Sequence, residues 1–140
     1  MISSSIKTGF ESAEVRKLWV TLKFTFGLVP IVAGADKFTN FLVDWSQYLN
    51  ADLISILPFS AGTFMMIVGL IEIVAGILVL TRTELGAYVV AAWLAGIAFT
   101  LIISWSFVDV AVRDLVMAVG ALTLARLTSI KNSNDPRRVV

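Results

Sequence analysis

The sequence contains no cysteine and no histidine in its 140 residues. Their absence excludes disulfides, thiol chemistry, iron–sulfur ligation by thiolates and the usual haem ligands. We therefore expect this chain to bind no metal and no cofactor by itself. The sequence also has no self-contained catalytic motif, so it leaves open whether the protein is part of an enzyme.

Charged residues are scarce, at 15% of the chain, whereas 58% of the residues are hydrophobic and the mean hydropathy is +0.89. A chain of this size is then too apolar for an ordinary soluble domain and is predicted to be an integral membrane protein whose first partner is the lipid bilayer. The net charge is only +1, and the basic residues lie mainly near the two ends. We expect no nucleic-acid partner.

The longest apolar run, residues 59–80, is long enough to cross a bilayer as a helix and contains one carboxylate, Glu72. Gly62, Gly69 and Gly76 recur every seven residues, and Glu72 falls on their face of the helix. The carboxylate is thus predicted to point into a helix interface. An ionisable group in that position is either a functional site or one half of an ion pair that fixes two helices, and the sequence favours neither.

Three further spans are predicted, at residues 18–38, 84–105 and 107–127. In the last of them Asp114 shares a face with alanines seven residues apart, Ala111, Ala118 and Ala125. Residues 39–57 are predicted to form a short extracytoplasmic interfacial helix, and Pro58 to begin the next span. Capping pairs are expected at Thr8 with Glu11 and at Thr81 with Glu84. The predicted fold is a single all-α membrane domain, an up-down bundle of four transmembrane helices with one extra interfacial helix, flanked by polar segments 1–17 and 128–140.

Orientation follows from the lysines and arginines near the span ends. Two of them, Lys37 and Arg113, fall on one side of the four-span arrangement. The other nine fall on the opposite side: Lys7, Arg16, Lys17, Lys23, Arg82, Arg126, Lys131, Arg137 and Arg138. Both termini are therefore predicted to be cytoplasmic.

This topology predicts two groups of charges within the bundle. The outer group, an ion-pair cluster or a ligand site, contains Asp36, Lys37, Asp109, Arg113 and Asp114. Within it we expect Lys37 to pair with Asp114, and Asp109 to pair with Arg113 four residues later along the helix. The deeper group contains Glu72 and Lys23, which can pair if the first two spans are neighbours, because an unpaired charge at that depth costs several kcal/mol.

Three short motifs carry a resemblance to a known family. They are Gly34-Ala35-Asp36-Lys37-Phe38, then Gly69 with Glu72 and Gly76, then Arg113 with Asp114. Over residues 18–127 the chain resembles the DoxX family of four-span membrane proteins. The resemblance implies a bacterial or archaeal inner-membrane protein, and some members of that family are subunits of thiosulfate:quinone oxidoreductase. It points to Lys37, Glu72, Arg113 and Asp114 as the matching positions, without a catalytic role for any of them.

Three functions fit the sequence. The first is an accessory or anchoring subunit without chemistry of its own, held together by its small-residue stripes, with membrane or peripheral protein subunits as partners. The second is a subunit of a quinone-linked complex, in which Arg113 or Lys37 donates a hydrogen bond to a quinone and Asp109 or Asp114 relays protons. The third is a small proton-coupled transporter that uses Glu72 as its carrier.

Overall fold

The computed structural model describes residues 13–135, and the regular structure of that range is entirely helical. Its elements in chain order are α2 (Ala13–Thr39), the 3-10 helix η1 (Trp45–Tyr48), α3 (Ala51–Ile56), α4 (Ala61–Thr81), α5 (Thr83–Ile103) and α6 (Val108–Ser133). The expected cap formed by Thr8 and Glu11 lies outside the described residues.

Three of the helices, α2, α4 and α5, are long and apolar enough to cross a membrane. The prediction of an all-helical, multi-pass membrane protein is confirmed at that level. Helix α6 has 26 residues but is not among the three, and its charged residues occur along most of its length, at Asp109, Arg113, Asp114, Arg126 and Lys131. The fourth crossing therefore stays a prediction.

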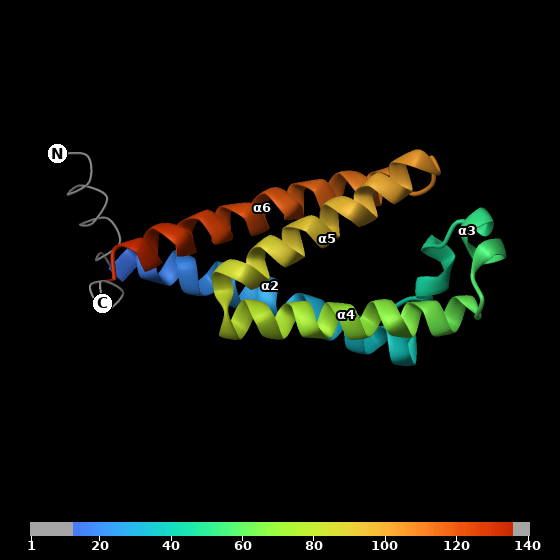
Figure 1. The fold of residues 1–140 in the computed structure, drawn as a ribbon, viewed down its shortest axis with the longest axis horizontal. Coiled ribbons are helices and arrows are strands. Elements are labelled where there is room, and N and C mark those ends of the chain that lie inside the picture. The colour runs from blue at the N-terminus through green and yellow to red at the C-terminus, as the bar shows by residue number, and fades with distance from the viewer. Residues whose placement is uncertain (1–12, 136–140) are drawn as a thin grey trace.

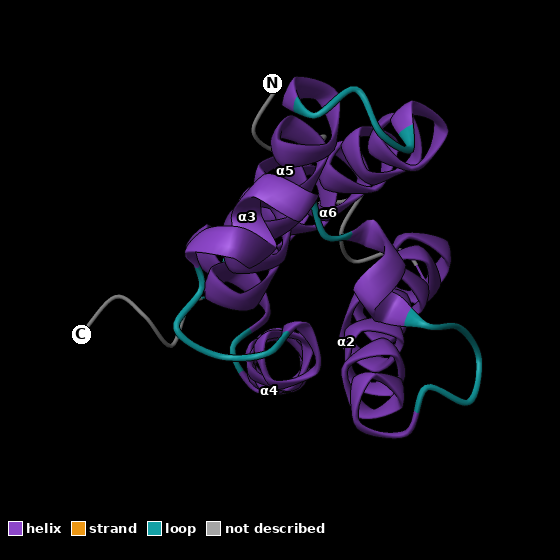
Figure 2. Cartoon of the chain, turned by 90° about the vertical axis from the view of Figure 1, so that its right-hand side faces the viewer, coloured by secondary structure: helices purple, strands orange, loops and turns teal. Residues whose placement is uncertain are grey.

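The long helices form two antiparallel pairs. Helix α2 packs along α4, and α5 packs along α6, while the contact between α4 and α5 is smaller. The two pairs lie close together at one end of the bundle and diverge toward the other (Figures 1 and 2). We call the first end, which contains the Thr81–Thr83 turn, the turn end, and the opposite end, which contains residues 40–60 and 104–107, the loop end.

Glycines bring the backbones of α2 and α4 into contact at two levels. Gly34 faces Gly69, and Gly27 faces Gly76, so that a Cβ at Gly69 would lie 2.5 Å from the Gly34 carbonyl oxygen. The repeat of seven residues keeps both contacts on one face of each helix. The sequence prediction that this glycine face of α4 is an interface is confirmed at these positions, whereas nothing lies within 4 Å of a Cβ at Gly62.

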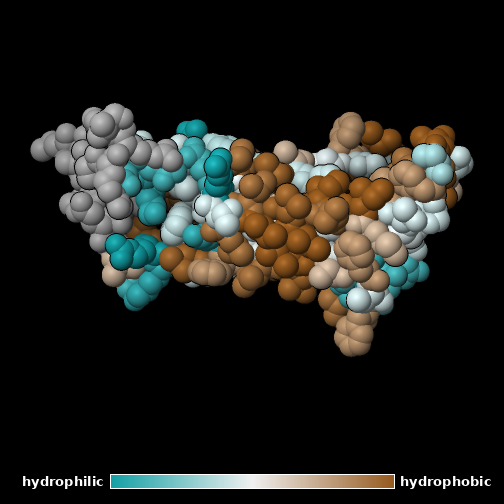
Figure 3. Space-filling view, turned by 60° about the horizontal axis from the view of Figure 1, so that its bottom comes forward, coloured by the Kyte–Doolittle hydropathy of each residue, from teal (hydrophilic) through white to brown (hydrophobic). Residues whose placement is uncertain are grey.

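Small apolar residues close the bundle toward the turn end. Val79 of α4, Val90 of α5 and Leu124 of α6 are almost fully buried there, together with alanines of the same three helices, and Trp19 and Phe26 of α2 pack against them. The predicted alanine stripe of α6 is buried as expected, with Asp114 on the same face. Apolar side chains cover the middle of the outer surface as well (Figure 3), which suits a chain surrounded by lipid.

The connection between α4 and α5 is a single residue, Arg82. It is that short because Gly86 lets the first turn of α5 approach the backbone at Val79, where a Cβ would have no room. The predicted capping box of Thr81 with Glu84 is wrong. Thr81 still belongs to α4 and donates its hydroxyl to the Ile77 carbonyl at 2.8 Å, and no side chain caps the start of α5.

The segment between α2 and α4 contains two short helices, η1 and α3, where a single interfacial helix was expected. Each is started by a side chain: Asp44 accepts from the Ser46 N–H at 3.1 Å, and Asn50 accepts from the Asp52 N–H at 3.0 Å. Ser60 caps α4 in the same way, so Pro58 precedes that helix and does not occupy its first turn. Residues 40–60 lie at the loop end, where the helix pairs diverge (Figure 1).

Candidate functional site

The centre of the candidate site is an ion pair between α2 and α4. The Lys37 ammonium donates to the Glu72 carboxylate with 2.6 Å between Nζ and Oε2, and the two side chains are only 4% and 12% exposed. The partners come from the glycine faces of the two helices, since Lys37 follows Gly34 by one turn and Glu72 follows Gly69 by one turn. The close backbone contact thus brings the two charges together.

The structure corrects the predicted pairings, because Glu72 is bound to Lys37 and not to Lys23. The reason is the direction of side chains, which lean toward the N-terminus of their own helix. In this antiparallel pair Lys37 leans toward the middle of the bundle and Glu72 leans toward the loop end, so they meet. Lys23 leans toward the turn end, away from Glu72, and its ammonium lies 5.1 Å from the centre of the Trp19 ring.

Asp114 of α6 is the third buried charge of this region, at 8% exposure. It lies near enough to Lys37 and Glu72 for their charges to act on its carboxylate, yet no hydrogen bond or ion pair to Asp114 occurs within residues 13–135. The expected Lys37–Asp114 pair is therefore not formed, because Lys37 is already bound to Glu72. With both acids ionised, the three side chains carry one positive and two negative charges.

Two tryptophans complete the surroundings of the ion pair. The indole of Trp93 on α5 donates to the second Glu72 oxygen, Oε1, at 3.4 Å. The Lys37 ammonium lies 3.7 Å from the centre of the Trp45 ring, which places η1 over the pair as a cover on the loop-end side. Sequence reasoning placed Trp45 only within the interfacial segment 39–57 and Trp93 only within the span 84–105, and it predicted neither as a neighbour of the ion pair. The lone acid Glu72 could have indicated such neighbours, because a buried carboxylate requires hydrogen-bond donors close to it.

Asp36 fixes the segment that carries Trp45. Its carboxylate accepts from the Trp45 indole at 2.7 Å, from the backbone N–H groups of Phe41 and Leu42, both at 3.0 Å, and from the Thr39 hydroxyl at 3.1 Å. The predicted cluster residue Asp36 thus holds the chain after α2 in place and touches the ion pair only through Trp45. Tyr48 secures the same segment to α6 by an edge contact with Phe107, with ring centres 4.7 Å apart.

Asp109 and Arg113 do not join the buried charges. They form the predicted pair along α6, with 3.9 Å between the charged atoms, on a face where their side chains are 67% and 75% exposed. The expected cluster of five is therefore divided. Lys37 and Asp114 lie in the buried site with Glu72, Asp36 lies beside it, and Asp109 and Arg113 face outward because they are on the other side of α6 from its alanine stripe.

The buried site, defined as Lys37, Glu72, Asp114, Trp45 and Trp93, joins all four long helices or their connections. It can hold the helices in register, or exchange a proton between two carboxylates that lie near one ammonium. No group of acidic side chains suited to a metal ion occurs within residues 13–135. No family model, curated protein or solved structure matches the chain.

Proposed function

We propose that this protein is a small integral-membrane subunit of the DoxX-like type, an accessory or anchoring component of a membrane complex, with four crossings and both termini in the cytoplasm. The observation that carries the proposal is the buried Lys37–Glu72 ion pair. Each charge finds its compensation inside the chain, so the pair serves as a clasp between α2 and α4. Quinone-linked electron transfer is the kind of complex that the family resemblance favours.

The surroundings of the pair support the clasp. Both charges are held by further contacts, Lys37 by the Trp45 ring and Glu72 by the Trp93 indole, so neither is free to change partner without moving a neighbouring element. A carboxylate that carries protons across a membrane must lose and regain its charge, and a bound ammonium at 2.6 Å opposes that. A clasp, in contrast, requires only that each buried charge is neutralised by a partner and that the two side chains fit the space between the helices.

The clasp can be tested by removing its charges together. Replacing a buried ion pair by uncharged residues of similar volume is often neutral, whereas removing one partner is costly. The test variant is Lys37→Met with Glu72→Gln and Asp114→Asn, in which the glutamine keeps an acceptor for Trp93. Wild type, this triple variant and single Lys37→Met are extracted from native membranes in mild detergent, and co-migrating proteins are identified by mass spectrometry.

The clasp predicts that the triple variant keeps the partners of the wild type and supports their activity, while the single variant loses both. Loss of the partners' activity by a triple variant that still assembles would contradict the clasp, because the charges would then be needed for chemistry. Recovery of wild-type protein without any partner would contradict the accessory role.

A second candidate function is favoured by Asp114. This acid is buried, lies beside an existing ion pair and has no hydrogen bond within residues 13–135. Two buried carboxylates near one ammonium form a coupled set, in which either acid can hold a proton. It supports a proton-coupled transporter that uses Glu72, or a quinone site in which Lys37 is the donor. Arg113 is a weaker quinone donor because its side chain is exposed.

For this second function, purified protein is reconstituted in vesicles, and proton-driven transport is compared between wild type, Glu72→Gln and Asp114→Asn. Loss of transport in both variants, with normal insertion, is the expected result for a proton carrier. Transport that survives both changes excludes the role of these acids. For a quinone site, bound quinone is extracted and quantified from wild type and from Lys37→Met, which should retain less.

A further inference from the structure

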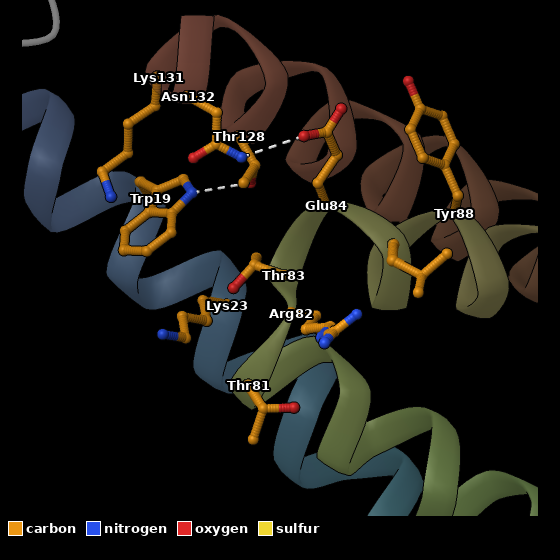
Figure 4. A pocket seen from close by; sticks show the side chains of 11 residues that line it. Trp19, Lys23, Thr81, Arg82, Thr83, Glu84, Tyr88, Thr128, Lys131 and Asn132 are labelled. Atoms are coloured by element: carbon orange, nitrogen blue, oxygen red, sulfur yellow. Dashed lines mark hydrogen bonds between the residues drawn. The ribbon is translucent and has the colours of Figure 1, made fainter. Parts of the chain in front are cut away.

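A second polar region lies at the turn end of the bundle, away from the ion pair. At the turn end a cavity of about 640 Å³ opens between the start of α2, the α4–α5 turn and the last turns of α6 (Figure 4). We propose that this cavity binds a phosphate group, carried either by a phospholipid headgroup or by a free phosphate compound. The proposal is independent of the clasp and of any partner protein.

Three cations line the cavity, one from each part of its wall: Lys23 from α2, Arg82 from the turn and Lys131 from α6. None of them forms an ion pair with another residue of the described range 13–135. The acid in the lining is Glu84, which accepts a hydrogen bond from the Asn132 amide at 3.0 Å. The cavity thus has an excess of positive charge that the described residues do not neutralise.

Trp19 lies close to two of these cations. The ammonium groups of Lys23 and Lys131 lie 5.1 and 4.2 Å from the centre of its ring. The ring itself is fixed, because its indole donates to the Thr128 hydroxyl at 2.9 Å and Thr128 is buried (Figure 4). An aromatic face attracts a cation without removing its charge. Both ammonium groups therefore lie close to the Trp19 ring and keep the charge that an anion would meet.

The start of α5 adds donors of another kind. No side chain caps this helix, and Thr83, its first residue, lines the cavity with a hydroxyl that has no hydrogen bond within residues 13–135. The first N–H groups of a helix and its dipole favour an anion at that place. A phosphate oxygen near Thr83 would therefore meet a helix start together with three cations.

The position of the cavity favours a phosphate at a membrane surface. Helices α4 and α5 are both long and apolar enough to cross a bilayer, so the turn that joins them lies where a crossing ends. Lipid phosphates lie at that level, and basic pockets between transmembrane helices are typical sites for anionic headgroups. Soluble phosphate compounds reach the same level from the aqueous side, and the chemistry of the cavity is the same for both.

The test compares two triple variants of equal charge. The site variant is Lys23→Gln with Arg82→Gln and Lys131→Gln. The control variant is Arg16→Gln with Lys17→Gln and Arg126→Gln, three exposed residues of the same end that do not line the cavity. Each full-length protein is titrated with phosphatidylglycerol and with phosphatidylcholine in detergent, and bound lipids are counted by native mass spectrometry. Thermal unfolding without lipid shows that each variant is folded.

Wild type and the control variant should bind phosphatidylglycerol more tightly than phosphatidylcholine, and the site variant should bind it roughly a hundredfold more weakly, at about fivefold per cation. Glu84→Gln should strengthen binding, because it removes the one carboxylate of the lining while keeping an acceptor for Asn132. Equal losses in the site and control variants, or no preference for the anionic lipid in the wild type, would overturn a lipid site.

Inorganic phosphate distinguishes the two sources. If millimolar phosphate raises the melting temperature of wild type but not of the site variant and displaces phosphatidylglycerol, the cavity takes free phosphate compounds. If only the lipid binds, the source is a headgroup. Both results support the proposal. If neither the lipid nor phosphate binds, the proposal is refuted. The clasp is unaffected by any of these outcomes, since the variants leave Lys37, Glu72 and Asp114 unchanged.

Discussion

The two halves of the bundle solve the same packing problem with different chemistry. Toward the turn end, the apolar half joins α4, α5 and α6 through Val79, Val90, Leu124 and alanines, with Trp19 and Phe26 of α2 against them. Toward the loop end, the charged half contains the buried site around Lys37 and Glu72, and a second buried apolar cluster lies between α5 and α6 around Ala98, Leu101 and Ala111.

This difference follows from the distance between the helix pairs. Where the pairs are close together, small residues suffice to fill the interface, and dispersion contacts stabilise it. Where the pairs diverge, only long side chains with polar ends bridge the space, and they require compensation for every charge. The apolar half is therefore expected to tolerate polar substitutions poorly and to allow no exchange of packing partners. In the charged half, by contrast, a change of protonation can open the contact between the helices.

The largest expected effect is that of Lys37→Met. It leaves the buried carboxylates of Glu72 and Asp114 without their ammonium, and removing one partner of a buried ion pair costs about 3–5 kcal/mol. Unfolding in detergent, followed by tryptophan fluorescence, measures the loss. The matched control is the neutral variant Lys37→Met with Glu72→Gln and Asp114→Asn, which should recover most of the stability. A single variant as stable as wild type would show that the ion pair is not needed to hold α2 against α4.

Gly69→Ala should have the next largest effect. A methyl group at that position would lie 2.5 Å from the Gly34 carbonyl oxygen and 3.0 Å from the Lys37 Cβ, so α2 must move away from α4. Overpacking of this kind costs about 1–3 kcal/mol. Gly62→Ala is the control, because nothing lies within 4 Å of its Cβ, and it should be neutral or slightly stabilising. Thermal unfolding of the two variants in parallel decides whether the glycine contact is needed for the clasp.

The sequence was sufficient to predict the parts of this structure that depend on periodicity. Apolar runs gave the long helices to within a few residues, and the spacing of seven residues gave the faces that contain Gly69, Gly76, Ala118 and Asp114. Each of these follows from residues close together along one helix. The same reasoning placed Glu72 in a helix interface and Lys37 in the outer group of charges, although not as partners.

The pairing could not be predicted because it depends on distances between helices. The estimate of depth along each span ignored the lean of side chains toward the helix N-terminus, which separates Lys23 from Glu72 and brings Lys37 to it. The contact between Trp45 and Asp36 was not predicted, because the two residues lie nine positions apart and meet only through the way the connection after α2 folds. The predicted capping box at Thr81 was wrong because Gly86 permits a turn between α4 and α5 that is tighter than a capping box requires.

Trp45→Phe tests the cover over the ion pair. Phenylalanine keeps a ring near the Lys37 ammonium but attracts a cation less strongly than indole, and it loses the hydrogen bond to Asp36. We expect a moderate loss of about 1 kcal/mol and faster hydrogen exchange at the backbone N–H groups of Phe41 and Leu42, which Asp36 binds. Trp105→Phe is the control, since that side chain is 77% exposed. Unchanged exchange at residues 41 and 42 would show that Asp36 holds the segment without Trp45.

The smallest expected effect is that of Arg113→Gln. The variant is useful because it allows the exposed face of α6 to be compared with its buried face. The pair with Asp109 is exposed and its charged atoms are 3.9 Å apart, so its removal should change stability by no more than about 0.5 kcal/mol. Asp114→Asn, one residue further along, changes the buried face and the charge beside Lys37 and Glu72. If the charged half alone carries function, partner binding and any quinone-dependent turnover should respond to Asp114→Asn and remain unchanged in Arg113→Gln. A larger response to Arg113→Gln would move the site to the exposed face of α6, where a partner subunit or lipid covers it.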